Sequence, residues 1–279
     1  MADTQQSAAS AQHSESSQPS AAASAKERAH VLAQLHASGD LIVLPTVWDV
    51  WSARLAAQVG FKALTIGSHP VANALGEPDG EHQNMDHYFA IARAIAAAVD
   101  IPVSLDVESG LGLDPQELVD RVLAAGIAGV NIEDVVHSEG NRVRTLEEQA
   151  NYVGQVRKAA DAAHVELVIN GRTDALVWGT DGDTRVDDPL QEAIDRSLAM
   201  QDAGARSVYP VALETPDQVR ALTDNLTVPV NVTANPVTGH PAGSSLDELK
   251  KLGVRRVSYG PQWQMALEEP AQAMLQAWV

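Results

Sequence analysis

The feature that most constrains the fold is an alternation that repeats along the chain from about residue 41. Short apolar, β-branched runs alternate with longer stretches of helical periodicity. The expected strands are residues 41–44, 63–66, 103–106, 129–132, 166–170, 207–209, 229–232 and 256–258. The expected helices between them are residues 50–59, 85–99, 115–125, 146–163, 189–203, 215–222 and 245–252, with a last one from about residue 262. Eight strands alternating with helices predict an α/β protein, a closed (β/α)8 TIM-type barrel.

Helix-boundary residues support this prediction. Asp114 and Pro115 suit the N-cap and first position of a helix, and Gly126, Gly204 and Gly253 each follow a helical stretch, where C-cap glycines occur. The alternative is an open, doubly wound sheet. That fold favours a Gly-x-Gly-x-x-Gly turn after an early strand, and the sequence has none.

The N-terminal segment differs in composition from the rest. Residues 1–25 are mainly Ser, Ala and Gln with almost no large apolar side chains, so we expect a disordered tail. A helix is expected from about Lys26 to just before Gly39. Residues 26–279 are predicted to form one barrel domain with this N-terminal helix and a C-terminal helix.

Charge and composition exclude several classes of function. Lys plus Arg number 19 and Asp plus Glu 37, giving a net charge of −18, which disfavours nucleic acids and anionic membranes. The absence of cysteine excludes disulfides, thiolate metal sites and a cysteine catalyst. No apolar run approaches the roughly 20 residues of a membrane span. We expect a cytoplasmic protein whose partner is a small molecule.

Acidic residues gather where the expected strands end, which is where a barrel carries its active site. Asp106 and Glu108 lie two residues apart and should face the same way, and Glu133 and Asp134 end the next strand. Such an oxygen-rich cluster suits Mg2+ or Mn2+ rather than zinc. The alternative is that these acids cap helices or pair with arginines.

Other side chains at this rim leave alternatives open. Arg172 suits a carboxylate ligand, or it forms an ordinary ion pair with Asp174. Among the histidines, His69 and His137 are the only candidates for the site. Trp48 lies where it could contact a ligand, although tryptophans more often pack.

Five segments together resemble the isocitrate lyase and phosphoenolpyruvate mutase superfamily. They are LPTVWDVWSARLAAQVGFKAL, NALGEPDG, SLDVESGLG, GVNIEDV and VINGRTDA, and the resemblance runs from about Leu41 to about Met265. It is greatest to the short mutase-like members, which include oxaloacetate decarboxylases, phosphonopyruvate hydrolases and methylisocitrate lyases.

The resemblance implies a role for each matching residue. The implied Mg2+ site comprises Asp79, Asp106, Glu108 and Glu133. The implied substrate-binding residues are Trp48, Gly67, Ser68, Asp106, Arg172, Asn231 and Thr233. Family members are typically homotetramers in which the final helix is exchanged between neighbouring subunits, so we expect the same here.

Two departures from the family bear on the reaction. Lyase members carry Lys-Lys-Cys-Gly-His in the loop after the fourth strand, with Cys as the general acid, whereas this loop reads VVHSEGNRVRT. Lyases for tricarboxylates also place a Glu after the sixth strand, where Val211 is expected here. Both departures disfavour cleavage of isocitrate or methylisocitrate.

These features predict a Mg2+-dependent lyase or decarboxylase that acts on an oxaloacetate-like 2-oxo acid through an enolate. Arg172, Glu133 and His137 are the expected catalytic residues. Decarboxylation is the least demanding reaction without a Cys acid, because carbon dioxide leaves unprotonated. The alternatives are C–P chemistry on phosphonopyruvate or phosphoenolpyruvate, and a barrel that binds a 2-oxo acid without turnover.

Overall fold

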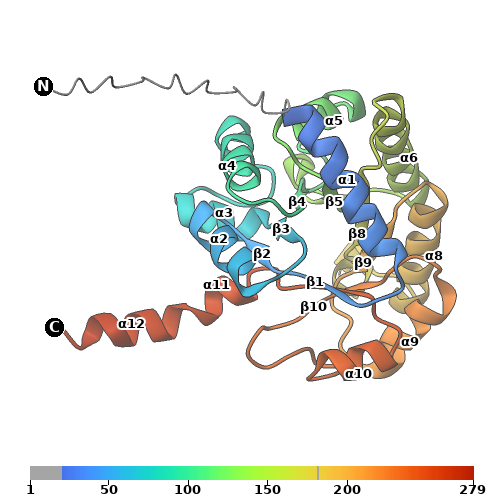
Figure 1. Cartoon of the computed structure of the whole chain (residues 1–279). Coiled ribbons are helices and arrows are strands. Elements are labelled where there is room, and N and C mark those ends of the chain that lie inside the picture. Colours follow the sequence, from blue (N-terminus) through green and yellow to red (C-terminus); the bar gives the residue numbers. More distant parts are fainter. Residues whose placement is uncertain (1–20, 181) are drawn as a thin grey trace, which may run out of the picture.

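The computed structural model describes residues 21–180 and 182–279 (Figure 1). The first helix, α1 (Ala21–Ala37), begins five residues before the position expected from the sequence, and its Ala25 is fully buried. Residues 1–20 of the expected tail lie outside the described residues. The division into a tail and one domain therefore stays a prediction.

The strands form a closed parallel barrel. They are β1 (Ile42–Leu44), β2 (Thr46–Val47), β3 (Leu64–Ile66), β4 (Val103–Asp106), β5 (Gly129–Ile132), β8 (Val168–Thr173), β9 (Ser207–Pro210), β10 (Asn231–Thr233) and β11 (Arg256–Ser258). One sheet has the order β2-β3-β4-β5-β8-β9 and the other β1-β11-β10, with all these pairings parallel.

Two local features close the ring. Pro45 has no N–H to donate and therefore interrupts the first strand of the barrel. β1 and β2, on either side of Pro45, are the two parts of that strand. A parallel bridge between Val208 and Val230 joins β9 to the chain that enters β10. Eight strand positions result, and the predicted (β/α)8 barrel is confirmed.

Two strands are displaced from their expected positions. β8 begins at Val168 and continues to Thr173, so Arg172 lies within the strand rather than after it. β10 begins at Asn231, two residues later than expected, because Pro229 cannot donate a ladder hydrogen bond. Both shifts bring polar residues into regular strand geometry near the carboxyl ends.

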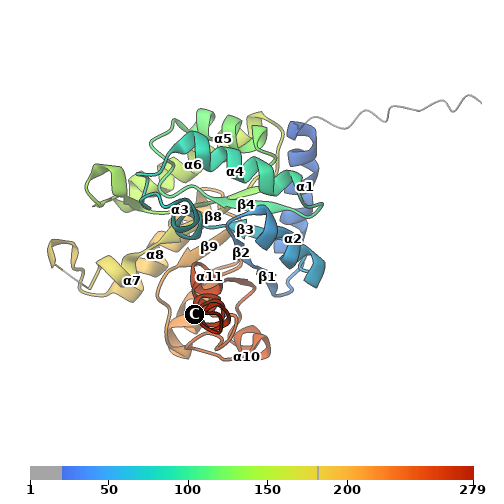
Figure 2. The same ribbon diagram turned by 90° about the vertical axis from the view of Figure 1, so that its left-hand side faces the viewer.

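Most helices fall where the sequence predicts them, on the outside of the barrel (Figures 1 and 2). They are α2 (Val50–Val59), α4 (Met85–Ala97), α5 (Pro115–Ala124), α6 (Leu146–Ala162), α8 (Pro189–Asp202), α9 (Pro216–Asn225) and α10 (Leu246–Lys251). As expected, the Asp114 side chain caps α5 and Pro115 is its first residue.

Several elements were not anticipated. The region after β3 contains α3 (Ser68–Leu75), and the loop after β5 contains a hairpin of β6 (Val135–Val136) and β7 (Arg142–Val143) around the short helix η1 (His137–Glu139). A short helix α7 (Ala175–Trp178) follows β8, and η2 (Gly182–Thr184) comes next. The expected last helix is two, α11 (Gln262–Ala266) and α12 (Glu268–Gln276).

Helix α1 ends at a buried histidine that contacts the last strand. His36 Nδ1 lies 2.8 Å from the carbonyl oxygen of Leu32, and its Nε2 lies 3.0 Å from Nη1 of Arg256. Burial and the neighbouring Arg256 lower the pKa of His36 to about 3, so this imidazole is neutral in the folded protein. Helix α1 thus contacts the barrel interior as well as its outside.

Replacing His36 with glutamine is expected to make the free energy of unfolding fall less when the pH is lowered from 7 to 5. In the unfolded chain His36 binds a proton near pH 6.5, whereas in the folded protein it does so only near pH 3. Between these values the unfolded state holds more protons, so His36 makes wild-type stability fall by about 1.4 kcal/mol for each pH unit of acidification. Urea unfolding of both proteins at pH 7 and pH 5 measures the difference. Equal acid losses in the two proteins would contradict the assignment.

No helix in residues 21–180 or 182–279 is long and apolar enough to cross a membrane.

Candidate active site

A cavity of about 910 Å3 opens at the carboxyl ends of the strands. Its walls combine residues from β2, β3, β4, β5, β8, β9, β10 and β11 with the loops that follow them. Residues predicted for the site that line this cavity are Gly67, Ser68, His69, Asp79, Asp106, Glu108, His137, Arg172 and Thr233. The structure therefore brings most of the predicted residues to one place.

Asp106 and Glu108 reach the cavity through an irregular end of β4. Glu108 has a positive φ of 50°, uncommon for a residue other than glycine, and its N–H donates to Asp106 Oδ1 at 3.1 Å. The Tyr88 hydroxyl donates to the backbone carbonyl of Asp106 at 2.6 Å, which holds the strand end in place. The two carboxylates thus reach one cavity through a turn rather than through continued strand alternation.

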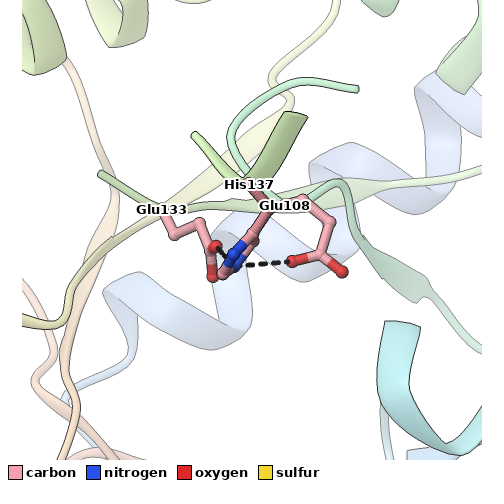
Figure 3. A group of neighbouring side chains, drawn as sticks. All are labelled: Glu108, Glu133 and His137. Carbon is pink, nitrogen blue, oxygen red and sulfur yellow. Dashed lines mark ion pairs between the residues drawn. The ribbon is translucent and has the colours of Figure 1, made fainter. Parts of the chain in front are cut away.

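Two glutamates and a histidine, Glu108, Glu133 and His137, form a cluster at the rim of the barrel (Figure 3). Asp106 is near enough for its charge to act on both glutamates. His137 Nε2 is 2.7 Å from Glu133 Oε1 and 4.0 Å from Glu108 Oε2. Glu133 has no exposed surface, and Glu108 is only 3% exposed. The η1 turn that carries His137 therefore closes over the acids of β4 and β5.

Arg172 is held by two carboxylates. Its Nη1 lies 2.7 Å from Glu133 Oε2, and its Nε and Nη2 donate to the two oxygens of Asp174 at 2.7 and 2.8 Å. Both readings of Arg172 are thus compatible with the geometry, because the guanidinium is paired with Asp174 and also lines the cavity.

The electrostatics of the cluster follow from crowding of acids away from water. Burial, and then the charges of Asp106, Glu133 and Asp79, raise the pKa of Glu108 to about 9. Burial also raises the pKa of Glu133, against the opposing effect of Arg172. The 2.7 Å contact with Glu133 Oε1 raises the pKa of His137 to about 9. Without a further cation, the cluster is stabilised by holding a proton.

The donor set fits a divalent cation. Glu108, Glu133 and His137 each offer a ligand atom within 4.8 Å of the others. Among the described residues, Glu108 Oε1 and Asp79 Oδ1 are buried without a hydrogen-bond partner, and neither Glu133 oxygen makes a well-aligned hydrogen bond. Buried acceptors without partners are costly, and a cation would satisfy them. Carboxylate oxygens are the ligands of Mg2+ and Mn2+.

Asp79 meets the cavity from the loop after α3. Its Oδ2 lies 3.1 Å from His69 Nδ1. In the same region, Gly67 is the N-cap of α3 and has no side-chain cap; its N–H donates to the Val47 carbonyl oxygen at 3.3 Å, so the free amides of the first turn begin at Ser68. Free amides at a helix N-terminus attract anions.

Asp134, the neighbour of Glu133, points away from the cavity. It is fully buried and accepts from the Thr173 hydroxyl at 2.6 Å, from the Asp174 N–H at 3.1 Å and from Arg196 Nη1 at 3.2 Å. Because every one of these partners is structural, Asp134 supports the architecture of the rim rather than the metal site.

Two of the predicted substrate-binding residues are not among those that line the cavity. Trp48 is buried and packs edge-on against Trp263, with ring centroids 5.1 Å apart. Asn231 is buried and donates to the Ser258 hydroxyl at 3.0 Å. Their substrate contacts stay predictions. Thr233 does line the cavity, where its hydroxyl bonds the Tyr209 hydroxyl.

Glu81 was not predicted from the sequence, and its carboxylate connects three loops. Its Oε1 accepts from the Ser109 hydroxyl at 2.5 Å and the Leu111 N–H at 3.2 Å. Its Oε2 accepts from the Ser138 N–H and hydroxyl at 3.1 and 2.7 Å. The only sequence signal was a second acid two residues after Asp79.

Comparison with known proteins agrees with this geometry. The family model described as phosphoenolpyruvate phosphomutase matches residues 32–278. An uncharacterized protein of Mycobacterium tuberculosis is 32% identical over 81% of this chain and 80% of its own length. Oxaloacetate decarboxylase 1 of Pseudomonas fluorescens is 30% identical over 80% and 74%. A crystal structure described as a phosphonomutase candidate from Burkholderia cenocepacia has a TM-score of 0.78 and 33% identity, covering 90% of this chain and 99% of that one.

Proposed function

Because the chain belongs to the phosphoenolpyruvate mutase/isocitrate lyase superfamily, a group of lyases and mutases, we propose that it is a divalent-metal-dependent lyase or decarboxylase of an oxaloacetate-like 2-oxo acid. The observation that carries this proposal is the buried cluster at the cavity. It combines several acids, a guanidinium and buried oxygens that lack partners among the described residues. Such a set suits a cation together with a small anionic substrate.

The proposed cation is Mg2+, with Mn2+ as a substitute. Asp106, Glu108 and Glu133 would hold it, and Asp79 would support it from the loop after α3. When bound, the ion acts as a Lewis acid toward the oxygens of a 2-oxo acid. The protein's own contribution is to supply negative oxygens and to keep His137 in contact with Glu133.

The groups proposed to bind the substrate carboxylate make the electrostatic potential locally positive, although the chain as a whole is negatively charged. The chain as a whole carries a net charge of −18, which repels anions. Arg172 supplies a positive charge inside the cavity, and the amide of Ser68 supplies a donor at the start of α3, next to Gly67. Selective binding of an anion therefore depends on this small region.

The proposed bond cleavage is beta to the keto group. In oxaloacetate the C3–C4 bond breaks, its electron pair passes into the enolate of pyruvate, and carbon dioxide leaves without a proton. The enolate carbon then takes one proton to give pyruvate. His137 is the proposed proton source, because its Nε2 faces the cluster and the η1 turn carries it at the cavity wall.

An assay of pyruvate release from oxaloacetate tests the proposal. We expect release above the metal-catalysed background with Mg2+ present, and release at the background rate after chelation. Phosphate release from phosphonopyruvate, with no pyruvate release from oxaloacetate, would favour the C–P alternative. Oxalate stabilising the protein with Mg2+, with no turnover of either substrate, would favour the binding-only alternative and contradict the proposal.

We also propose that the chain forms a homotetramer through its C-terminal helix. In Figure 1, α12 extends away from the barrel. Met274, Leu275 and Trp278 are 72%, 70% and 91% exposed, a large apolar surface for a free monomer. We expect light scattering to give a tetramer for the native chain and smaller species for a Leu275→Glu/Trp278→Glu variant. A tetramer that survives both substitutions would contradict this role of α12.

A further inference from the structure

A line of hydrogen bonds runs across the barrel interior at the floor of the cavity, which Arg256, Asn170 and Asn131 help to line. Arg256 Nη1 donates to the Ser207 hydroxyl oxygen at 3.1 Å, and that hydroxyl donates to Asn170 Oδ1 at 2.7 Å. Asn170 Nδ2 donates to Asn131 Oδ1 at 2.8 Å. Asn131 is the register partner of Asp106 on the neighbouring strand, and its side chain helps to lower the pKa of the Asp106 carboxylate against the larger effect of burial. The line therefore connects the last strand to the acid at the end of β4.

The starting point of the line is an unusual cation. Arg256 is 1% exposed, and no carboxylate of the described chain lies within ion-pair distance of it. Burial lowers the pKa of Arg256 to about 9, which leaves the guanidinium charged at neutral pH. Burying a charge without a paired carboxylate costs free energy, so a buried Arg256 is expected to have a role that offsets this cost.

Arg256 fixes the direction of the first bond in the line, because a guanidinium can only donate. The Ser207 oxygen therefore accepts from Arg256 and keeps its single proton for Asn170. Asn170 presents its oxygen to Ser207 and its amino group to Asn131. Asn131 in turn presents its oxygen to Asn170, and its amino group is left for Asp106.

The lower end of the line is fixed in the same way. The carbonyl oxygen of Leu32 accepts from His36, so the ring proton lies on Nδ1. The free lone pair on Nε2 then accepts from Arg256 Nη1. Helix α1 thereby holds the guanidinium in the orientation that starts the line.

We propose that Arg256, Ser207 and Asn170 are positioning residues that orient the Asn131 amide as a donor toward Asp106, which directs this carboxylate for cation binding. If one hydrogen bond of the line is removed, the side-chain amides of Asn170 and Asn131 can rotate. Asn131 can then present its oxygen instead of its amino group to Asp106. Two oxygens would then face each other, and the carboxylate would turn or lose its hydrogen bond. This inference rests on the proposed metal role of Asp106.

The test is Mn2+ affinity in the absence of substrate, measured by electron paramagnetic resonance well below the melting temperature of each variant. Ser207→Ala removes the central hydroxyl and is expected to weaken Mn2+ binding by roughly 3- to 10-fold, as loss of a group supporting a metal ligand does. Ser207→Thr keeps the hydroxyl and is expected to bind within about twofold of the native protein, as a retained donor requires.

The matched control is Ser197→Ala. Ser197 is also a fully buried serine, but its hydroxyl has no partner among the described residues. Equal Mn2+ affinities in Ser207→Ala and Ser197→Ala would overturn the inference. If Asp106→Ala weakens Mn2+ binding while Ser207→Ala does not, the positioning role fails and the proposed metal site stands. If neither changes Mn2+ binding, the metal role of Asp106 and the inference both fail.

Discussion

Asp106→Ala is expected to lower kcat/KM for the 2-oxo acid by about 1000-fold or more, roughly 4 kcal/mol of transition-state stabilisation. Asp106 lies at the end of β4, lines the cavity and adjoins the cluster of Glu108 and Glu133. Removing its carboxylate takes away a negative oxygen from the proposed cation site. Steady-state pyruvate release at saturating Mg2+ measures the loss.

The fold should tolerate this change. Burial raises the pKa of Asp106, so its carboxylate costs free energy in the native state, and the strand end is held independently by the Tyr88 hydroxyl. Asp120→Ala, which removes an exposed acid of α5, is the matched control and should retain full activity. A folded Asp106→Ala protein with native kcat/KM would eliminate the proposed site.

Asp134→Ala is expected to lower the free energy of unfolding by about 3 kcal/mol, because it removes a fully buried carboxylate that accepts from three donors. The Arg196 guanidinium keeps Glu192 as an ion-pair partner, but the Thr173 hydroxyl and the Asp174 N–H lose their acceptor. Urea unfolding followed by circular dichroism measures the change.

Glu133→Ala provides the comparison, since Glu133 is the adjacent residue and equally buried. Neither Glu133 oxygen makes a well-aligned hydrogen bond, whereas Asp134 accepts from three donors, and Arg172 keeps Asp174 as a partner when Glu133 is removed. We therefore expect a smaller loss of stability than for Asp134→Ala, together with a large loss of activity. The opposite order of stabilities would show that Asp134 has been assigned the wrong role.

The barrel could be predicted from sequence because its signals are local. Strand and helix periods alternate, and Asp114 and Pro115 mark a helix start within a few residues. The acids of the site could be found for a related reason. In a parallel barrel the residues that end successive strands share one rim, so topology brings Asp106 and Glu133 together, whereas Glu108 joins them through the turn after β4.

What escaped prediction depends on contacts between distant segments. Nothing near Asp134 reveals that Arg196, 62 residues later, turns it away from its neighbour Glu133. Trp48 packs on Trp263 from the other end of the chain. Similarly, the hairpin around His137 depends on a three-dimensional setting that includes Glu81, 57 residues before Ser138.

The carboxylate of Glu81 makes the rim thermodynamically cooperative. It accepts from Ser109 and Leu111 after β4 and from Ser138 in η1, while Glu81 itself follows α3. Three segments therefore share one acceptor, and ordering any of them lowers the entropic cost of ordering the others. Conversely, a change in the length of one loop is felt in all three. The mouth of the barrel should consequently open and close as a unit rather than loop by loop.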